Sequence, residues 1–230
     1  MNKMDAYDLG PVPYREAWDL QHEIQAQIID EKRAEQKGLL SGERMNDVLL
    51  LVEHPHVYTL GKSGDQQHLL RSDEELKKLN AEFVKIDRGG DITYHGPGQI
   101  VGYPIMDLDR HFTDIHKYLR YLEEVIILTC KDYGFDAGRI DGLTGVWIDD
   151  KKICAMGIRS SRWVTMHGFA FNVNAHLDYF NHIVPCGIHH KAVTSLEELT
   201  ASPIDMEDAK KRVIKNFEQV FDVQIQLHTA

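Results

Sequence analysis

The sequence predicts an α+β fold in one domain, with a mixed, largely antiparallel sheet and flanking helices. Three well-separated stretches carry apolar residues at helical spacing, and short runs of β-branched and aromatic residues lie between them. Of the 230 residues, 43% are hydrophobic, which is enough for one substantial core. Since no low-complexity linker divides the chain, we expect residues 1–230 to form a single domain.

The first half of the chain alternates between helix and strand patterns. Ala17, Leu20 and Ile24 mark the apolar face of the first helix, and His54-Pro55 marks a turn between two strands. The predicted elements are a helix at 14–37, strands at 47–53 and 57–60, a short helix that begins at the capping box 72–75, and a strand at 83–86. No element is predicted before residue 14.

The second half contains two more long helices and most of the strands. Cys130 falls on the apolar face of the first of these helices, so we expect it to be a core residue. The predicted elements are a strand, loop and strand over 88–108, a helix at 115–133, strands at 146–148, 152–159 and 164–174, a short helical segment at 177–181, a capping box at 195–198, a helix at 209–221 and a closing strand at 223–227.

Residues 88–104 are unusual because five glycines and two prolines interrupt residues that otherwise favour a strand. Glycine leaves room above the main chain, so we expect something to approach this backbone closely. A glycine-rich hairpin accounts for Gly89-Gly90. It does not account for Arg88, His95 and Gln99 beside it.

This stretch resembles, nearly residue for residue, the hallmark segment of the lipoyl(octanoyl) transferases. The resemblance continues in order over residues 53–62, 145–147, 152–157, 167–172, 185–187 and 194–196. It implies the fold of the biotin and lipoate protein ligases. It also implies an enzyme that moves octanoyl groups from acyl carrier protein onto lipoyl domains, the first step of endogenous protein lipoylation. His56 and Lys62 depart from the proline and arginine that are common in that family, in a segment expected to shape the entrance to the site.

Cys186 lies between a proline and a glycine, in a loop where backbone amides can point at an acyl oxygen. The local pattern alone suits a nucleophile and a structural cysteine equally well, but the resemblance implies that Cys186 is the acyl-thioester nucleophile. The resemblance also implies that Lys152 lowers the pKa of this thiol. Strand alternation predicts that Lys152 and Cys154 share one face, which makes Cys154 a competitor for the nucleophile's role. We prefer Cys186.

The resemblance implies acyl-binding positions in three runs that are rich in small and apolar residues. They are Arg88, Gly89, Gly90, Asp91, Ile92, Thr93, Tyr94, His95, Ala155, Met156, Gly157, Gly168, Phe169 and Ala170. Arg88 is expected to position the polar end of the acyl group, and His95 and His167 are alternative acid–base groups. His54 and His56 belong to no metal-ligand pattern, and we expect no metal and no cofactor.

Composition and the resemblance together limit the expected partners. A formal net charge of −10 disfavours sequence-independent nucleic-acid binding, which requires a basic surface. Lys62, Arg88, Arg159, Arg162 and Lys191 lie in or near the motif segments, either as a local basic patch or as scattered charges. The resemblance implies octanoyl-acyl carrier protein as donor. It implies the lipoyl domains of 2-oxoacid dehydrogenase complexes and glycine cleavage H protein as acceptors, with no nucleic acid and no membrane.

The sequence also indicates where the protein works and leaves two other functions open. No apolar run approaches the ~20 residues that span a bilayer and no signal segment is visible, so we expect a cytoplasmic protein. Three cysteines without a CxxC pair argue against a disulfide framework or a structural zinc site. One alternative is an ATP-dependent lipoate or biotin-type protein ligase, against which the lack of a separate nucleotide loop counts. The other is a noncatalytic module that binds acyl carriers or lipoyl domains.

Overall fold

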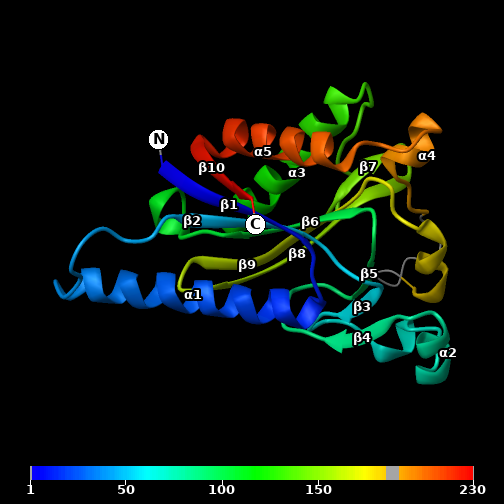
Figure 1. Ribbon diagram of the computed structural model, residues 1–230, viewed down its shortest axis with the longest axis horizontal. Coiled ribbons are helices and arrows are strands. Elements are labelled where there is room, and N and C mark those ends of the chain that lie inside the picture. The colour runs from blue at the N-terminus through cyan, green and yellow to red at the C-terminus, as the bar shows by residue number, and fades with distance from the viewer. Residues whose placement is uncertain (1, 185–191, 230) are drawn as a thin grey trace.

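A seven-stranded mixed sheet forms the centre of the computed structural model, which describes residues 2–184 and 192–229 (Figure 1). Its strands, in spatial order, are β10 (Val223–Thr229), β1 (Asn2–Pro11), β2 (Asp47–Glu53), β6 (Gln99–Ile105), β9 (Val164–Asn172), β8 (Lys151–Ser161) and β7 (Val146–Ile148). β10, β1 and β2 pair in parallel, and the remaining pairs of this sheet are antiparallel. The predicted mixed, largely antiparallel sheet is therefore confirmed.

β1 is the element that the sequence analysis missed. Only Met4 and Ala6 of this strand are fully buried hydrophobic residues, so its local pattern is weak. The strand pairs with β10 from the other end of the chain and with β2. Asp8 also accepts a 2.8 Å hydrogen bond from the ammonium of Lys210 on helix α5 (Met206–Phe221). Pairing with two distant neighbours, not local periodicity, makes this segment a strand.

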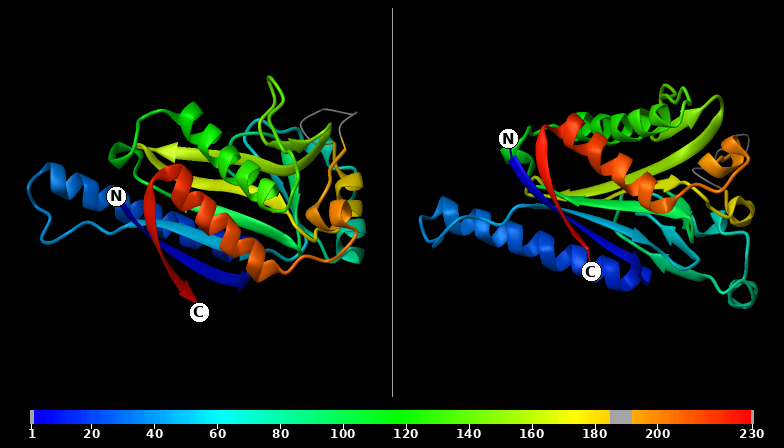
Figure 2. Two further views of the ribbon diagram at one scale, coloured as in Figure 1. Left: turned by 90° about the horizontal axis from the view of Figure 1, so that it is seen from above. Right: turned by 45° about the horizontal axis from the view of Figure 1, so that its top comes forward.

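Helices cover both faces of the large sheet (Figures 1 and 2). α1 (Tyr14–Gln36) packs on one face, where Ala17 and Ile28 join a core formed with β2, β6 and β9. α3 (Ile115–Asp132) and α5 lie together on the other face. Cys130 of α3 is fully buried in this second core, as predicted, and burial raises the pKa of its thiol to about 12.

A second, three-stranded sheet carries the first half of the glycine-rich segment, whose second half forms β6 of the large sheet. β3 (Val57–Leu60) is its central strand, with β4 (Glu82–Lys85) parallel on one side and β5 (Ile92–His95) antiparallel on the other. The remaining elements are η1 (Gln66–His68), α2 (Asp73–Lys78), η2 (Leu108–Arg110), η3 (Leu177–His182) and α4 (Leu196–Thr200). The predicted capping box is present at the start of α2, where Ser72 and Glu75 each accept a hydrogen bond from the main chain of the other. At the start of α4 only half of the predicted box forms: Ser195 accepts from the Glu198 N–H, but the Glu198 carboxylate binds Thr194 and Lys151 instead. No helix in the described part of the chain is long and apolar enough to cross a membrane.

His54 joins α1, β2 and the second sheet from a buried position. The ring is 1% exposed, its Nδ1 lies 2.7 Å from the carbonyl oxygen of Val12, and its Nε2 lies 2.7 Å from the hydroxyl of Tyr103. A neutral ring satisfies both contacts, because Nδ1–H donates to Val12 while Nε2 accepts from Tyr103. Burial lowers the pKa of His54 to about 4, so the folded protein holds this ring neutral.

We expect stability to fall as the pH drops from 7 to 5, because unfolding releases His54 to its ordinary pKa and lets it take up a proton. The folded pKa of about 4 lies below the unfolded value, so the loss begins near pH 6.5 and continues towards pH 4. His54 alone contributes about 2 kcal/mol to this change. Urea unfolding of His54→Gln at several pH values should show a correspondingly flatter pH profile than wild type. His116→Gln, at an exposed position, is the control and should keep the wild-type slope.

Candidate active site

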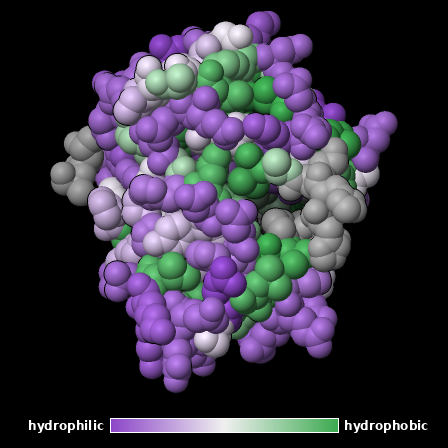
Figure 3. Space-filling view, turned by 90° about the vertical axis from the view of Figure 1, so that its right-hand side faces the viewer, coloured by the Kyte–Doolittle hydropathy of each residue, from purple (hydrophilic) through white to green (hydrophobic). Residues whose placement is uncertain are grey.

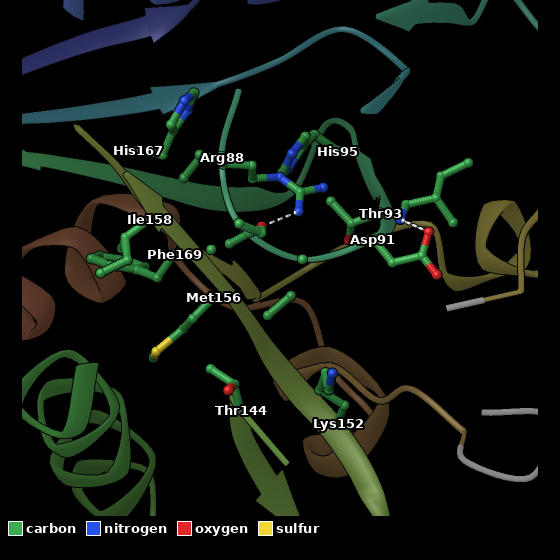
Figure 4. Close-up of a pocket in the computed structure, with 18 of the residues that line it drawn as sticks. Arg88, Asp91, Thr93, His95, Thr144, Lys152, Met156, Ile158, His167 and Phe169 are labelled. Carbon is green, nitrogen blue, oxygen red and sulfur yellow. Dashed lines mark hydrogen bonds between the residues drawn. The ribbon is translucent and has the colours of Figure 1, made fainter. Parts of the chain in front are cut away.

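A cavity of about 420 Å³ lies between the two sheets and runs along β8 (Figure 4). Lys152 lines one end, while Arg88, His95 and His167 line the other. On the face shown in Figure 3, apolar side chains gather around a hollow in a largely hydrophilic surface. The cavity is therefore an elongated channel with a cationic group at each end and apolar walls between them.

Small residues form the floor of the channel. Ala155 and Gly157 of β8 pair with Ala170 and Gly168 of β9, and all four line the cavity. A side chain at Gly157 would collide with Arg88, because an added methyl group would lie 2.9 Å from Arg88 Cδ. The missing side chains leave space along the sheet in which an extended chain can lie.

The structure brings together thirteen of the fourteen positions expected to bind the acyl group. Those that line the cavity are Arg88, Gly89, Gly90, Asp91, Ile92, Thr93, His95, Ala155, Met156, Gly157, Gly168, Phe169 and Ala170. Tyr94 is the exception, because its side chain packs in the core of the small sheet with Tyr58 and Leu76. Its ring stacks on Tyr179 and its hydroxyl lies 2.8 Å from His56 Nδ1.

Lys152 lies between two neighbours that the sequence analysis did not identify. Its ammonium is 4.7 Å from the ring centroid of Trp147, a cation–π contact. Gly145 has a φ of +121°, and a methyl group added there would lie 3.4 Å from Lys152 Cε and 2.6 Å from the carbonyl oxygen of Cys154. The main chain of Lys152 also donates to the carbonyl of Ala192 at 2.9 Å. The lysine is thus closely surrounded on several sides.

The prediction that Lys152 and Cys154 share a face is wrong. The pairing of β7 with β8 shifts by one residue between the pairs Val146–Cys154 and Trp147–Lys152, which leaves Ile153 as an extra residue. Cys154 is fully buried in the core below the sheet, whereas Lys152 lines the channel. Burial raises the pKa of the Cys154 thiol well above its ordinary value, so it is a poor nucleophile.

Cys186 lies outside the described residues, as does Lys191. Of the other expected basic residues, Arg88 is only 8% exposed and Arg159 forms an ion pair with Asp87. Arg162 lies in the turn between β8 and β9, beyond the part of β8 that lines the channel. Lys62 is exposed just after β3, and the basic patch stays a prediction.

A chain of buried hydrogen bonds starts at the Arg88 end of the channel. Arg88 Nη2 donates to the carbonyl oxygen and Oγ1 of Thr59 at 3.0 and 3.1 Å. Thr59 Oγ1 lies 3.3 Å from His95 Nε2, and His95 Nδ1 lies 3.3 Å from Gln99 Oε1. Gln99 in turn donates to Asn172 Oδ1 at 2.9 Å. Thr59, which sequence analysis overlooked within the conspicuous stretch 53–62, therefore links Arg88 to His95.

His95 and His167 are both neutral at neutral pH. Burial lowers the pKa of His95 well below its ordinary value, with nearby His54 and Arg88 adding to the effect. Burial also lowers the pKa of His167, although its Nε2 lies 2.9 Å from Asp87 Oδ1. The hydrogen bond from His167 lowers the pKa of Asp87 to about 2, so this carboxylate stays ionised. Either ring remains a candidate for accepting a proton.

In the described ranges 2–184 and 192–229, no group of three or more His, Cys, Asp or Glu side chains is arranged to hold a metal ion.

The architecture defines a class of protein. A bi-partite lipoate protein ligase of Thermoplasma acidophilum superposes on this chain with a TM-score of 0.71 and 15% identity, covering 100% of this chain and 88% of that one. The biotin protein ligase of Aquifex aeolicus does so with a TM-score of 0.54 and 12% identity, over 96% of this chain and 70% of that one. The predicted biotin/lipoate ligase-like fold is therefore confirmed.

Closer relatives place the chain within that class. The family model for the lipoyl protein ligase A/B catalytic domain matches residues 13–218. A curated octanoyltransferase of Christiangramia forsetii is 55% identical over 98% of this chain and 99% of its own length. One from Cytophaga hutchinsonii is 53% identical over 95% of this chain and 93% of its own length. This chain belongs to the lipoyl protein ligase A/B catalytic domain family, and these near full-length relatives in it are octanoyltransferases.

Glu123, which the sequence analysis also missed, holds the segment behind Lys152. This α3 carboxylate is fully buried, and its Oε2 accepts from Arg139 Nε and Arg120 Nη1, each at 2.8 Å. Its Oε1 accepts from the backbone N–H of Gly145 at 3.0 Å. Because Gly145 packs against Lys152, Glu123 fixes one wall of the lysine's environment.

Glu123→Ala should lower the free energy of unfolding by about 2–4 kcal/mol, because it removes a buried carboxylate that accepts from two arginines and from a buried backbone N–H. Glu124→Ala is the matched control, since Glu124 also binds Arg139 but is 40% exposed. It should cost less than about 1 kcal/mol. Urea unfolding of both variants measures the difference, and equal losses would contradict the assigned role of Glu123.

Proposed function

We propose that this chain transfers an octanoyl group from acyl carrier protein to a lysine of lipoyl domains through a thioester on Cys186. In this proposal residues 1–230 act as one cytoplasmic catalytic domain without a metal or cofactor. The acceptors are the lipoyl domains of 2-oxoacid dehydrogenase complexes and glycine cleavage H protein. The octanoyltransferases that match nearly the whole chain at 53–55% identity support octanoyl transfer in protein lipoylation as its activity.

The observation that carries the proposal is an apolar channel that ends at a lysine. Met156, Phe169 and Ile92 line its walls, and Lys152 lies at one end. Ala192, the first described residue after the segment that contains Cys186, lines the same cavity and accepts a hydrogen bond from the Lys152 main chain. These contacts favour Cys186 as the thiol that works with Lys152.

The first half-reaction forms the acyl-enzyme. The Cys186 thiolate attacks the carbonyl carbon of the octanoyl thioester, the bond to the carrier sulfur breaks, and the carrier thiolate takes up a proton. The ammonium of Lys152 stabilises the attacking thiolate, since an opposite charge favours the ionised form of a thiol. The channel holds the octanoyl chain in an extended conformation along Ala155 and Gly157 while this occurs.

The second half-reaction passes the acyl group to the acceptor lysine. Its amine must be neutral to attack, yet a free lysine with a pKa of ~10.4 is mostly protonated at neutral pH. When the sulfur becomes part of a neutral thioester, Lys152 no longer faces an anion and loses its proton more readily. Lys152 then accepts the proton of the attacking amine as the amide forms and Cys186 leaves. His95 and His167 are the competing bases for this step.

Mixing the enzyme with octanoyl-loaded carrier protein, without ATP, should give an octanoyl adduct on Cys186. Intact-protein mass spectrometry would detect the mass increase, and hydroxylamine should remove it because a thioester is labile to that nucleophile. Cys186→Ala should give no adduct, while Cys130→Ala is the matched control and should still be acylated. Transfer that requires ATP and leaves no adduct would indicate a ligase instead. Binding of carrier protein without transfer, in purified components, would indicate a noncatalytic module.

Replacing Lys152 should separate the two half-reactions. Lys152→Ala should slow both formation and discharge of the acyl-enzyme, because both the positive charge and the base are lost. Lys152→Arg should restore formation in part, but not discharge, since guanidinium stays charged. Quenched-reaction time courses, which follow formation and discharge of the acyl-enzyme separately, provide the measurement. Normal discharge from pre-acylated Lys152→Arg would exclude Lys152 as the base and favour a histidine.

A further inference from the structure

Arg88 lies at the end of the channel that is remote from Lys152. Its side chain lies across Gly157, since a methyl group added to Gly157 would be 2.9 Å from Arg88 Cδ and 3.3 Å from Nη1. Gly157 is five residues along β8 from Lys152, a distance of about 16 Å at the rise of a strand. Figure 4 shows Arg88 and Lys152 at opposite ends of the lining residues. In the proposed function the acyl carbonyl reacts beside Lys152, so Arg88 is distant from it and does not position the polar end of the acyl group as the resemblance led us to expect.

Thr59 keeps the guanidinium in this place. Arg88 Nη2 donates to the carbonyl oxygen and the hydroxyl of Thr59 on β3, and Nη1 donates to the carbonyl oxygen of Gly89 at 3.0 Å. Arg88 is only 8% exposed, so these are charge-assisted hydrogen bonds in a site with little water. Moving the guanidinium aside would break them and leave buried acceptors without a donor.

The other groups at this end are polar as well. His95, Tyr103 and His167 line it and are 6%, 3% and 1% exposed. A saturated acyl chain has no donor or acceptor to offer them. The apolar walls around Met156 and Phe169 therefore give way to a surface that methylene groups do not favour.

We propose that Arg88 is the end wall of the acyl channel and limits the length of the transferred chain. The inference rests on the proposed function, because it requires the thioester carbonyl to lie beside Lys152. Three bonds of an extended peptide span about 3.5 Å, so the seven carbon–carbon bonds of an octanoyl group span about 8 Å and fit within the ~16 Å between Lys152 and Gly157. The eleven carbon–carbon bonds of a dodecanoyl group span about 13 Å, which together with a contact distance of about 4 Å to Arg88 exceeds that length. A C12 chain therefore needs displacement of Arg88.

Competition among carrier proteins loaded with C6, C8, C10 and C12 chains tests this wall. Wild-type enzyme should form the C12 acyl-enzyme at least ~10-fold more slowly than the C8 acyl-enzyme. Arg88→Met should reduce that ratio by about 10-fold, because a flexible apolar side chain makes way for the longer acyl group. Arg33→Met, at an exposed position on α1, should leave the ratio unchanged.

Two further variants, Gly157→Ala and Thr59→Val, test the position of Arg88 at the end of the channel. Gly157→Ala places a methyl group against Arg88 and narrows the channel end, so the preference should move from C8 towards C6. Thr59→Val keeps the shape of the side chain and removes one acceptor of Arg88, so it should relax the cut-off in the same direction as Arg88→Met. If Arg88→Met does not fold, Thr59→Val still tests the end wall.

An equal loss of rate at every chain length, with the C8 to C12 ratio unchanged in Arg88→Met or Thr59→Val, would overturn the end wall.

Calorimetric binding of octanoic, decanoic and dodecanoic acids gives a readout that does not depend on transfer. If the acids show the cut-off and Arg88→Met relaxes it, but no carrier protein acylates the enzyme, the end wall holds and the proposed function fails. If acylation proceeds but chain length has no effect on either measurement, the proposed function holds and the end wall fails.

Discussion

The buried hydrogen-bond chain from Arg88 through Thr59, His95 and Gln99 to Asn172 is the constraint on which the site depends. Its members come from both sheets, since Thr59 and His95 belong to β3 and β5 while Gln99 and Asn172 belong to β6 and β9. Each is nearly or fully buried, so a missing partner would leave an unsatisfied polar group. The chain therefore fixes the position of the small sheet over the large one, and with it the channel between them.

Glycine and alanine residues at this junction let the strands pack closely and also leave a cavity above them. Gly168 packs tightly in the sheet, because an added methyl group would lie 2.7 Å from Pro104 Cδ. Beside it, Gly157 admits the Arg88 side chain, and Ala155 and Ala170 leave room for a ligand. The same shortage of side chains thus permits close packing of the sheet and leaves an acyl-sized space above it.

The two cations at the ends of the channel differ in the contacts that position them. Arg88 donates hydrogen bonds to backbone and side-chain oxygens, which suits a wall. Lys152 lies against the ring of Trp147 and the backbone of Gly145. In the proposed function, an arginine at the remote end and a lysine at the reactive end match a guanidinium that stays charged and an amine that exchanges a proton.

The sequence by itself determined most helices and strands and the small-residue floor, because these depend on local periodicity and on motif residues at fixed spacing. Only the tertiary structure decided the rest. β1 is a strand because residues from the other end of the chain pair with it, and Cys154 faces the core because the register of β7 and β8 shifts at Ile153. The roles of Thr59 and Glu123 arise from partners 29 and 22 residues away. Long-range pairing and burial set these features, and neither leaves a periodic signal in the sequence.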